Sequence, residues 1–238
     1  MSDQVKYMRS VWVGLLAPPV LFLLAIVAAS ISVGVVRGGD AQAIAEEVAG
    51  ATPVLLVIVQ MAMLLMLVGL LRRGGLSWRA IGWAVPEGKP VWREIVAGLL
   101  PGVVLGILYP TVLAPWMESL QRALGDYVPA GELLTSLGGS IVPFFIANVV
   151  LAPFVEESLY RGFALRSLAS RFGSLPAAVL TCVAFGLLHW AGGFWYMLLT
   201  GVVAGGLFTV LALWRRNTIA PLVAHLTLNI LEFLFVAL

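Results

Sequence analysis

Two adjacent glutamates, Glu156 and Glu157, follow an almost continuously apolar run at 141–155 of this sequence. A charged side chain at the centre of a bilayer costs about 2.5–3.5 kcal/mol on insertion scales, so ionisable groups in such a run are candidates for function. On a helix, Glu157 lies one turn before Arg161, in the order that favours an ion pair. The residue at the same distance from Glu156 is Tyr160, which carries no charge. The spacing therefore predicts that Arg161 holds Glu157 and that Glu156 is free for chemistry.

Both histidines of the chain lie in later apolar segments. His189 ends one of these segments, and the last segment carries His225, Asn229 and Glu232. The side chains at 225, 229 and 232 share one face of a helix because they are spaced by four and then three residues. Such a polar face would be costly against lipid, so we expect it to point into the helix bundle. The alternative, that these side chains only form hydrogen bonds between helices, stays open from the pattern alone.

A free carboxylate, two imidazoles and an amide in a water-poor cavity suit the hydrolysis of an amide bond. Glu156 can act as the general base for water. One histidine can orient that water or protonate the leaving amine, and the other histidine and Asn229 can donate hydrogen bonds to the developing oxyanion. A zinc site of two His and one Glu is the main alternative, although the sequence lacks His-Glu-x-x-His and Asn is an unusual zinc ligand. A nucleophile is poorly supported, because Ser158 faces away from Glu156 and Cys182 lies a turn or more from any candidate base.

The composition is that of a polytopic membrane protein. Of the 238 residues, 61% are hydrophobic and 11% are charged, whereas about 25% are charged in a typical soluble domain. The net charge of +2 is small and the basic residues are scattered, so no nucleic-acid partner is expected. The single cysteine, Cys182, excludes a disulfide within the chain and is expected to be a small core residue. We predict an all-α fold, a transmembrane helical bundle around an intramembrane catalytic cavity.

Hydrophobic segments predict about seven spans. The predicted spans cover 11–36, 52–71, 92–115, 139–171, 175–190, 194–213 and 218–238. Polar connections are predicted at 37–51, 72–93 and 116–138, the second with a short amphipathic piece at 76–83 that could lie in the membrane interface. Gly98, Gly102 and Gly106 in the third span have the spacing of a face that packs closely on another helix.

The distribution of basic residues predicts the orientation. Of the 14 lysines and arginines, all but Arg37 and Arg122 lie on one side of the predicted spans. By the positive-inside rule this side is cytoplasmic. We therefore expect a multi-pass protein of the cell inner (plasma) membrane with a cytoplasmic N-terminus.

Helix geometry places two of the polar groups at one level. If the chain reverses near Gly173, Glu156 and His189 each lie roughly 16–17 residues from the turn, or about 25 Å along neighbouring helices. These two side chains can then face each other. With the same rise per residue, the height of His225 along the bundle differs from that of His189 by about ten residues. A tilt, or a break at Gly205-Gly206, would be needed to close that gap.

Three short motifs resemble those of a known family. They are Glu156-Glu157-x-x-x-Arg161, Phe185-x-x-x-His189 and His225-x-x-x-Asn229, in this order. They are similar to the signature motifs of the CAAX protease and bacteriocin-processing (CPBP, or Abi) family, which includes the type II CAAX prenyl endopeptidases. The resemblance covers 141–236 and implies a glutamate-type intramembrane endopeptidase with a cavity open to the cytoplasm.

The resemblance also implies roles for the motif residues. Glu156 would be the base for water with His189 assisting, His225 and Asn229 would form the oxyanion site, and Glu157 and Arg161 would support them. Glu232 lies outside the motifs, and we expect it to make a structural hydrogen bond. The chain would then divide into N-terminal transmembrane helices at 1–140 and a catalytic helical core at 141–236.

The resemblance leaves the substrate open. Eukaryotic relatives cut after a prenylated cysteine, whereas bacterial relatives process peptides or act in bacteriocin immunity, and the sequence shows no prenyl pocket. The expected partners are membrane lipid and a peptide or lipidated protein. No cofactor is assigned; zinc is compatible with the residues but not required, and the oligomeric state is not determined. The alternatives are a non-catalytic immunity or accessory protein and a small transporter with a proton relay, the latter disfavoured by the lack of a repeat.

Overall fold

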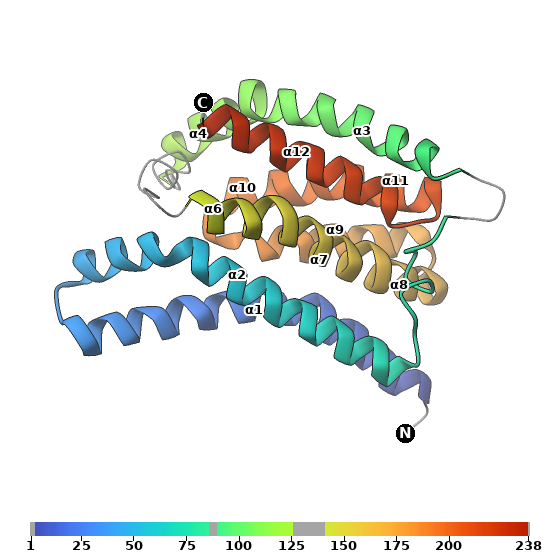
Figure 1. Cartoon of the computed structure of the whole chain (residues 1–238), viewed down its shortest axis with the longest axis horizontal. Coiled ribbons are helices and arrows are strands. Elements are labelled where there is room, and N and C mark those ends of the chain that lie inside the picture. The colour runs from blue at the N-terminus through green and yellow to red at the C-terminus, as the bar shows by residue number, and fades with distance from the viewer. Residues whose placement is uncertain (1–2, 86–89, 126–140, 238) are drawn as a thin grey trace.

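Every regular element of the described chain is helical, which confirms the predicted all-α fold. The computed structural model describes residues 3–85, 90–125 and 141–237. The helices run roughly parallel or antiparallel to one another, and the first two form a long hairpin along one side of the bundle (Figure 1). These are α1 (Asp3–Arg37) and α2 (Ala41–Gly74). The third segment joins α3 (Val91–Leu108), η1 (Tyr109–Leu113) and α4 (Ala114–Leu124).

The remaining segments carry all of the predicted catalytic residues, with His189 in the turn between two helices. The fourth segment consists of α6 (Ile141–Phe144), η3 (Phe145–Leu151), α7 (Ala152–Glu156), η4 (Glu157–Ala164) and α8 (Leu165–Phe172). The chain then continues through α9 (Ser174–Leu188), η5 (Trp190–Gly192), α10 (Phe194–Leu199), η6 (Thr200–Ala204), α11 (Gly205–Arg215) and α12 (Ile219–Ala237).

Seven apolar helical segments coincide with the seven predicted spans. Five are long and apolar enough to cross a membrane: Tyr7–Arg37, Ala41–Gly74, Val91–Leu124, Ile141–Phe172 and Phe194–Arg215. Two shorter apolar helices, Ser174–Leu188 and Ile219–Phe235, complete the set within the described residues. Many large apolar side chains on the outside are more than half exposed, including Leu24, Leu65 and Leu100. Such a surface suits lipid rather than water, and the chain is a multi-pass helical membrane bundle.

Two predicted polar connections were wrong because the helices extend into them. The segment predicted as a loop at 37–51 is helical from Ala41, and Asp40 caps this helix by accepting a hydrogen bond from the Ala43 amide at 2.9 Å. The loop predicted at 116–138 is helical as far as Leu124, and 126–138 lies outside the described residues. Hydropathy marks where apolar sequence ends, whereas residues such as Ala, Glu and Gln continue a helix into polar surroundings.

The described part of the connection between α2 and α3 packs on the helix bundle, and its predicted place in the membrane interface stays a prediction. Its described part forms turns, and Ile81 is 2% exposed. The indole nitrogen of Trp83 donates to the Ser158 hydroxyl at 3.0 Å. A Cβ at Gly162 would lie only 2.8 Å from the Ile81 carbonyl oxygen, so the small residue permits this contact. The connection therefore covers the helix that carries the acidic pair.

The predicted glycine face packs α3 directly on α12. These two helices make the most extensive helix–helix contact among the described residues, and they lie side by side in Figure 1. A Cβ at Gly102 would lie 2.8 Å from both the Ala224 carbonyl oxygen and the Thr227 Cβ. Helices of the two predicted parts thus share one interface, and the division at 140/141 stays a prediction.

Replacing Gly102 by Ala is expected to destabilise the protein by about 1–3 kcal/mol, because the new methyl group overpacks the contact between α3 and α12. Unfolding by heat or denaturant in detergent or nanodiscs measures this loss. Gly206→Ala is the matched control, since a Cβ at Gly206 meets nothing within 4 Å. Equal stability of the two variants would contradict a tight glycine contact.

Candidate active site

A cavity of about 90 Å³ lies between the helices. Its wall includes Glu156, His189, His225 and Asn229, the four residues predicted to be catalytic. A single water needs only about 10–15 Å³ of such space, so the cavity has room for several waters or for part of a substrate. The three motifs come from the fourth segment, from the end of α9 with the turn that holds His189, and from α12, and the fold brings their side chains to one place.

Glu156 ends α7 and has one engaged oxygen and one available oxygen. The side chain is 3% exposed, and its Oε1 accepts a hydrogen bond from Gln60 Nε2 at 3.0 Å. Its Oε2 is buried and has no hydrogen-bond partner among the described residues. A buried carboxylate oxygen of this kind needs a partner, and a water in the cavity can supply it. The geometry thus fits a carboxylate that holds water.

Gln60 is a site residue that the sequence analysis missed. It lies in α2, outside the predicted catalytic core, and it is 5% exposed. Its signal in the sequence is plain in retrospect, since it is the single polar residue in the apolar run 53–71. An amide in such a run is costly unless it is hydrogen-bonded inside the bundle.

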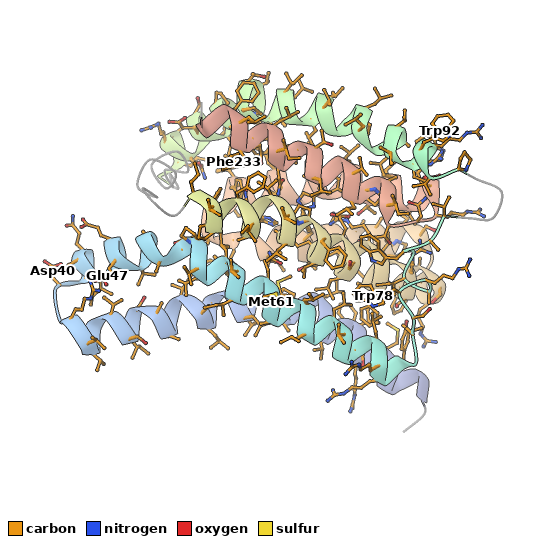
Figure 2. All side chains as sticks on the ribbon, in the orientation of Figure 1. Asp40, Glu47, Met61, Trp78, Trp92 and Phe233 are labelled. Carbon is orange, nitrogen blue, oxygen red and sulfur yellow. The ribbon has the colours of Figure 1, made fainter. Side chains whose placement is uncertain are left out.

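Replacing Gln60 by Leu is expected to reduce peptide cleavage about tenfold or more, because Glu156 loses the donor that fixes its orientation; a hydrogen bond to a charged group contributes about 1.5–3 kcal/mol. The measurement is the turnover of a model peptide together with the melting temperature. Met61→Leu is the control on the same helix, at a position that is 41% exposed (Figure 2). Full activity of Gln60→Leu would show that Glu156 needs no such donor.

Glu157 braces two other side chains. Its Oε1 accepts from Arg161 Nη1 at 3.0 Å, which confirms the predicted i,i+4 pair, and from His225 Nδ1 at 2.9 Å. Arg161 also donates to the Gly205 carbonyl at 3.1 Å and lies 4.2 Å from the centre of the Phe185 ring. The sequence did not predict that Glu157 also orients His225. The buried pair of Glu157 and Arg161, called the brace below, therefore connects η4 to both α11 and α12.

The hydrogen bonds of the two imidazoles determine which nitrogen remains available to the cavity. His189 Nδ1 lies 2.8 Å from the Phe185 carbonyl oxygen. A carbonyl can only accept, so His189 Nδ1 carries the hydrogen. His225 Nδ1 likewise donates to the Glu157 carboxylate. In both rings Nε2 is the atom left for a water or a substrate, and fixing the tautomer in this way is a common device at active sites.

The sequence placed His189 and His225 at different heights along the bundle. The structure brings their side chains together without a break in the sixth span. The Phe185 ring lies 4.8 Å from the ring of His189 and 6.0 Å from that of His225, so it sits between them. The chain is helical throughout Phe194–Arg215, with the π-helical turn η6 just before Gly205. The two imidazoles therefore share one cavity although they belong to distant parts of the chain.

Asn229 is held by a backbone carbonyl of a neighbouring helix. Its Nδ2 donates to the backbone carbonyl of Asn148 in η3 at 2.8 Å, which leaves its second N–H available. Asn148 also lines the cavity, and its role was not predicted. Phe233, one helical turn after Asn229, is labelled in Figure 2. Its ring packs edge-on to that of Phe145 with centroids 5.1 Å apart, which packs α12 against η3.

Four of the nine described polar residues that line the cavity lie in π-helical turns or directly beside one. Tyr109 lies in η1, Asn148 in η3 and Thr200 in η6, and η4 begins directly after Glu156. A π-helical turn leaves backbone geometry irregular and is frequent at functional sites. Simple helical spacing cannot anticipate these turns, because an inserted residue rotates every side chain that follows.

The candidate nucleophiles do not contribute to this cavity. The Ser158 hydroxyl donates to the Phe154 carbonyl at 2.6 Å and accepts from Trp83. Cys182 is half-buried, lies 3.5 Å from the Thr209 hydroxyl and borders a separate apolar groove. Neither side chain is among those that line the cavity with Glu156.

The zinc alternative has no matching ligand group in this arrangement. Within 3–85, 90–125 and 141–237, no three His, Cys, Asp or Glu side chains gather closely enough to hold a metal ion. The carboxylate nearest to His225 is Glu157, and that group is already paired with Arg161.

The fold and the cavity define a class: a multi-pass helical membrane protein with a buried carboxylate, two imidazoles and an amide around one small cavity. Residues 138–231 match the family model described as Rce1-like, type II CAAX prenyl endopeptidase Rce1-like. The resemblance inferred from the three motifs is thereby confirmed for this segment, which contains all three. The match indicates a protease of the CAAX intramembrane kind. No curated protein and no solved structure matches the chain.

Proposed function

We propose that the protein is an intramembrane endopeptidase that hydrolyses a peptide bond in a membrane-associated peptide or a lipidated, CAAX-type protein. The observation that carries this proposal is the convergence of Glu156, His189, His225 and Asn229 on one cavity. Glu156 presents one unpaired oxygen there. The family match over 138–231 supports the same activity.

Glu156 is the general base in this proposal. A water in the cavity donates a proton to Oε2 while its oxygen forms a bond to the carbonyl carbon of the substrate. The electron pair of the carbonyl double bond moves to the carbonyl oxygen. Gln60 holds Oε1 of Glu156 throughout, so the carboxylate keeps its orientation as it takes up the proton.

Asn229 and His225 stabilise the oxyanion. The free N–H of Asn229 donates directly, and His225 donates from Nε2 when the ring is doubly protonated and paired with Glu157. His189 Nε2 accepts a hydrogen bond from the water and so orients it. The proton that Glu156 took from the water then passes through His189 Nε2 to the leaving amine as the C–N bond breaks. Each of these groups is anchored by a second hydrogen bond, so the arrangement exists before substrate enters.

The membrane placement is part of the proposal. The N-terminal end of α1, the connection between α2 and α3, the turn between α8 and α9 and the turn between α11 and α12 lie at one end of the bundle (Figure 1). The basic segments of the sequence map to this end, and Arg37 and Arg122 lie at the opposite end. We therefore place this end, with the N-terminus, on the cytoplasmic side of the inner (plasma) membrane.

The experiment is cleavage by the purified protein in nanodiscs of two peptides that differ only in a farnesyl group on one cysteine. We expect a single peptide bond to be cut, with the products identified by mass spectrometry. Ser158→Ala and Cys182→Ala are expected to stay active, because neither side chain lines the cavity. Absence of cleavage of membrane-presented peptides of either kind would favour the non-catalytic alternative, and loss of activity in Ser158→Ala or Cys182→Ala would point to a nucleophile.

A further inference from the structure

A second carboxylate, Glu232, lines the cavity. It shares the inner face of α12 with His225 and Asn229, as the i, i+4, i+7 spacing predicted. The structural hydrogen bond predicted for it is not present among the described residues. Its electrostatic neighbours are Tyr109 and Tyr196, which line the same cavity. Glu232 is therefore an ionisable group of the wall that the proposed reaction does not use.

Two buried hydroxyl groups line the cavity together with Glu232. Tyr109 Oη and Thr200 Oγ1 lie close enough to interact with each other, but neither is fully hydrogen-bonded among the described residues. Thr200 is 7% exposed. Buried hydroxyls are normally hydrogen-bonded, so these two groups have capacity left for a polar group that enters the cavity. A hydroxyl oxygen and a carboxylate can both accept from an N–H group.

No lysine or arginine of the described chain lines the cavity. The ionisable groups of its wall are Glu156, Glu232, His189, His225 and the two tyrosines. Arg161 lies behind this wall and is paired with Glu157. A carboxylate without a cationic partner in a water-poor site must either take up a proton or pair with a cation that enters. The wall thus disfavours an anionic group of the substrate.

We propose that Glu232, with Tyr109 and Thr200, forms a subsite that binds a lysine or arginine side chain of the substrate close to the scissile bond. The inference rests on the proposed peptidase function, because it assigns the substrate preference of that same cavity. An ammonium or guanidinium group pairs with the carboxylate and donates its remaining hydrogens to the two hydroxyls. A substrate whose free terminal carboxylate falls at this point is disfavoured.

The test measures binding, so that it does not depend on turnover. Fluorescent peptides carry lysine, norleucine or glutamate at each position around the cleavage site in turn. They are titrated into nanodiscs that hold the Glu156→Gln protein, which cannot consume them. At one position, the lysine peptide is expected to bind about tenfold more tightly than the norleucine peptide. Adding Glu232→Gln should reduce this ratio to near one, and adding Glu232→Lys should favour the glutamate peptide instead.

The controls separate this proposal from the proposed function. Glu118→Gln, at an exposed position, is expected to leave the lysine preference unchanged. Equal binding of lysine and norleucine peptides, or a preference that survives Glu232→Gln, would overturn the subsite even if the wild-type protein cleaves peptides. If the wild-type protein cleaved no peptide but still preferred lysine through Glu232, the subsite proposal would stand. The proposed peptidase function would then be rejected.

Discussion

Glu156→Gln is expected to abolish peptide cleavage while the protein stays folded. A glutamine side chain has nearly the same shape but cannot take a proton from water, and general-base catalysis typically contributes 10²–10⁴-fold. The amide oxygen of the new side chain can still accept from Gln60 Nε2, which bonds Glu156 Oε1 at 3.0 Å. Replacing a buried carboxylate by a neutral amide also removes a desolvated charge. The melting temperature should therefore be unchanged or higher.

The measurement compares initial rates for Glu156→Gln and wild type on the same peptide in nanodiscs, with thermal unfolding on the same samples. Glu46→Gln is the matched control, because Glu46 is an exposed residue of α2 that accepts a hydrogen bond from Gln42. We expect wild-type rates for Glu46→Gln. Normal turnover by Glu156→Gln would exclude Glu156 as the base. It would favour the alternative that these polar side chains only form hydrogen bonds between helices.

The local part of the site could be predicted from the sequence. The ion pair of Glu157 with Arg161 and the common face of His225, Asn229 and Glu232 depend only on spacing along a helix. Their inward orientation follows from the cost of a polar face against lipid. These inferences hold in the structure because each involves residues of a single helix.

The parts that involve two or more helices could not be predicted in the same way. Nothing near Gln60 in the sequence indicates that α2 crosses the bundle at Glu156, or that Glu157 reaches α12 to hold His225. Tyr109 and Thr200 reach the cavity from π-helical turns. Such contacts depend on helix crossing and on local insertions in the helix, and neither leaves a periodic signal in one sequence.

The ends of the helices were predicted less well than their centres. The apolar runs located the membrane segments, but α2 begins at Ala41, eleven positions before the predicted start at Thr52. Asp40 determines this start by capping the helix. Hydropathy reports the surroundings of a segment, whereas capping and helix propensity determine where it ends. A prediction from capping residues as well as from hydropathy would have placed this boundary correctly.

The second large effect is expected from Arg161→Met, which should lower the stability of the folded protein by about 3–5 kcal/mol. The side chains of Arg161 and Glu157 are both fully buried, so removal of the guanidinium leaves a carboxylate in the interior that keeps, among the described residues, the hydrogen bond with His225. The hydrogen bond to the Gly205 carbonyl and the contact with the Phe185 ring are lost as well. The double variant Arg161→Met/Glu157→Gln should recover part of the loss, because it removes the stranded charge.

Arg122→Met is the matched control, since the pair of Arg122 with Glu118 lies on the surface with side chains that are 58% and 46% exposed. Exposed pairs contribute about 0–1 kcal/mol. Denaturant unfolding of the three variants in the same detergent measures the difference. The double variant is expected to unfold at a higher denaturant concentration than Arg161→Met and to remain poorly active, because His225 then lacks the carboxylate that orients it. If Arg161→Met were as stable as Arg122→Met, the buried brace would not be what holds η4 to α11 and α12.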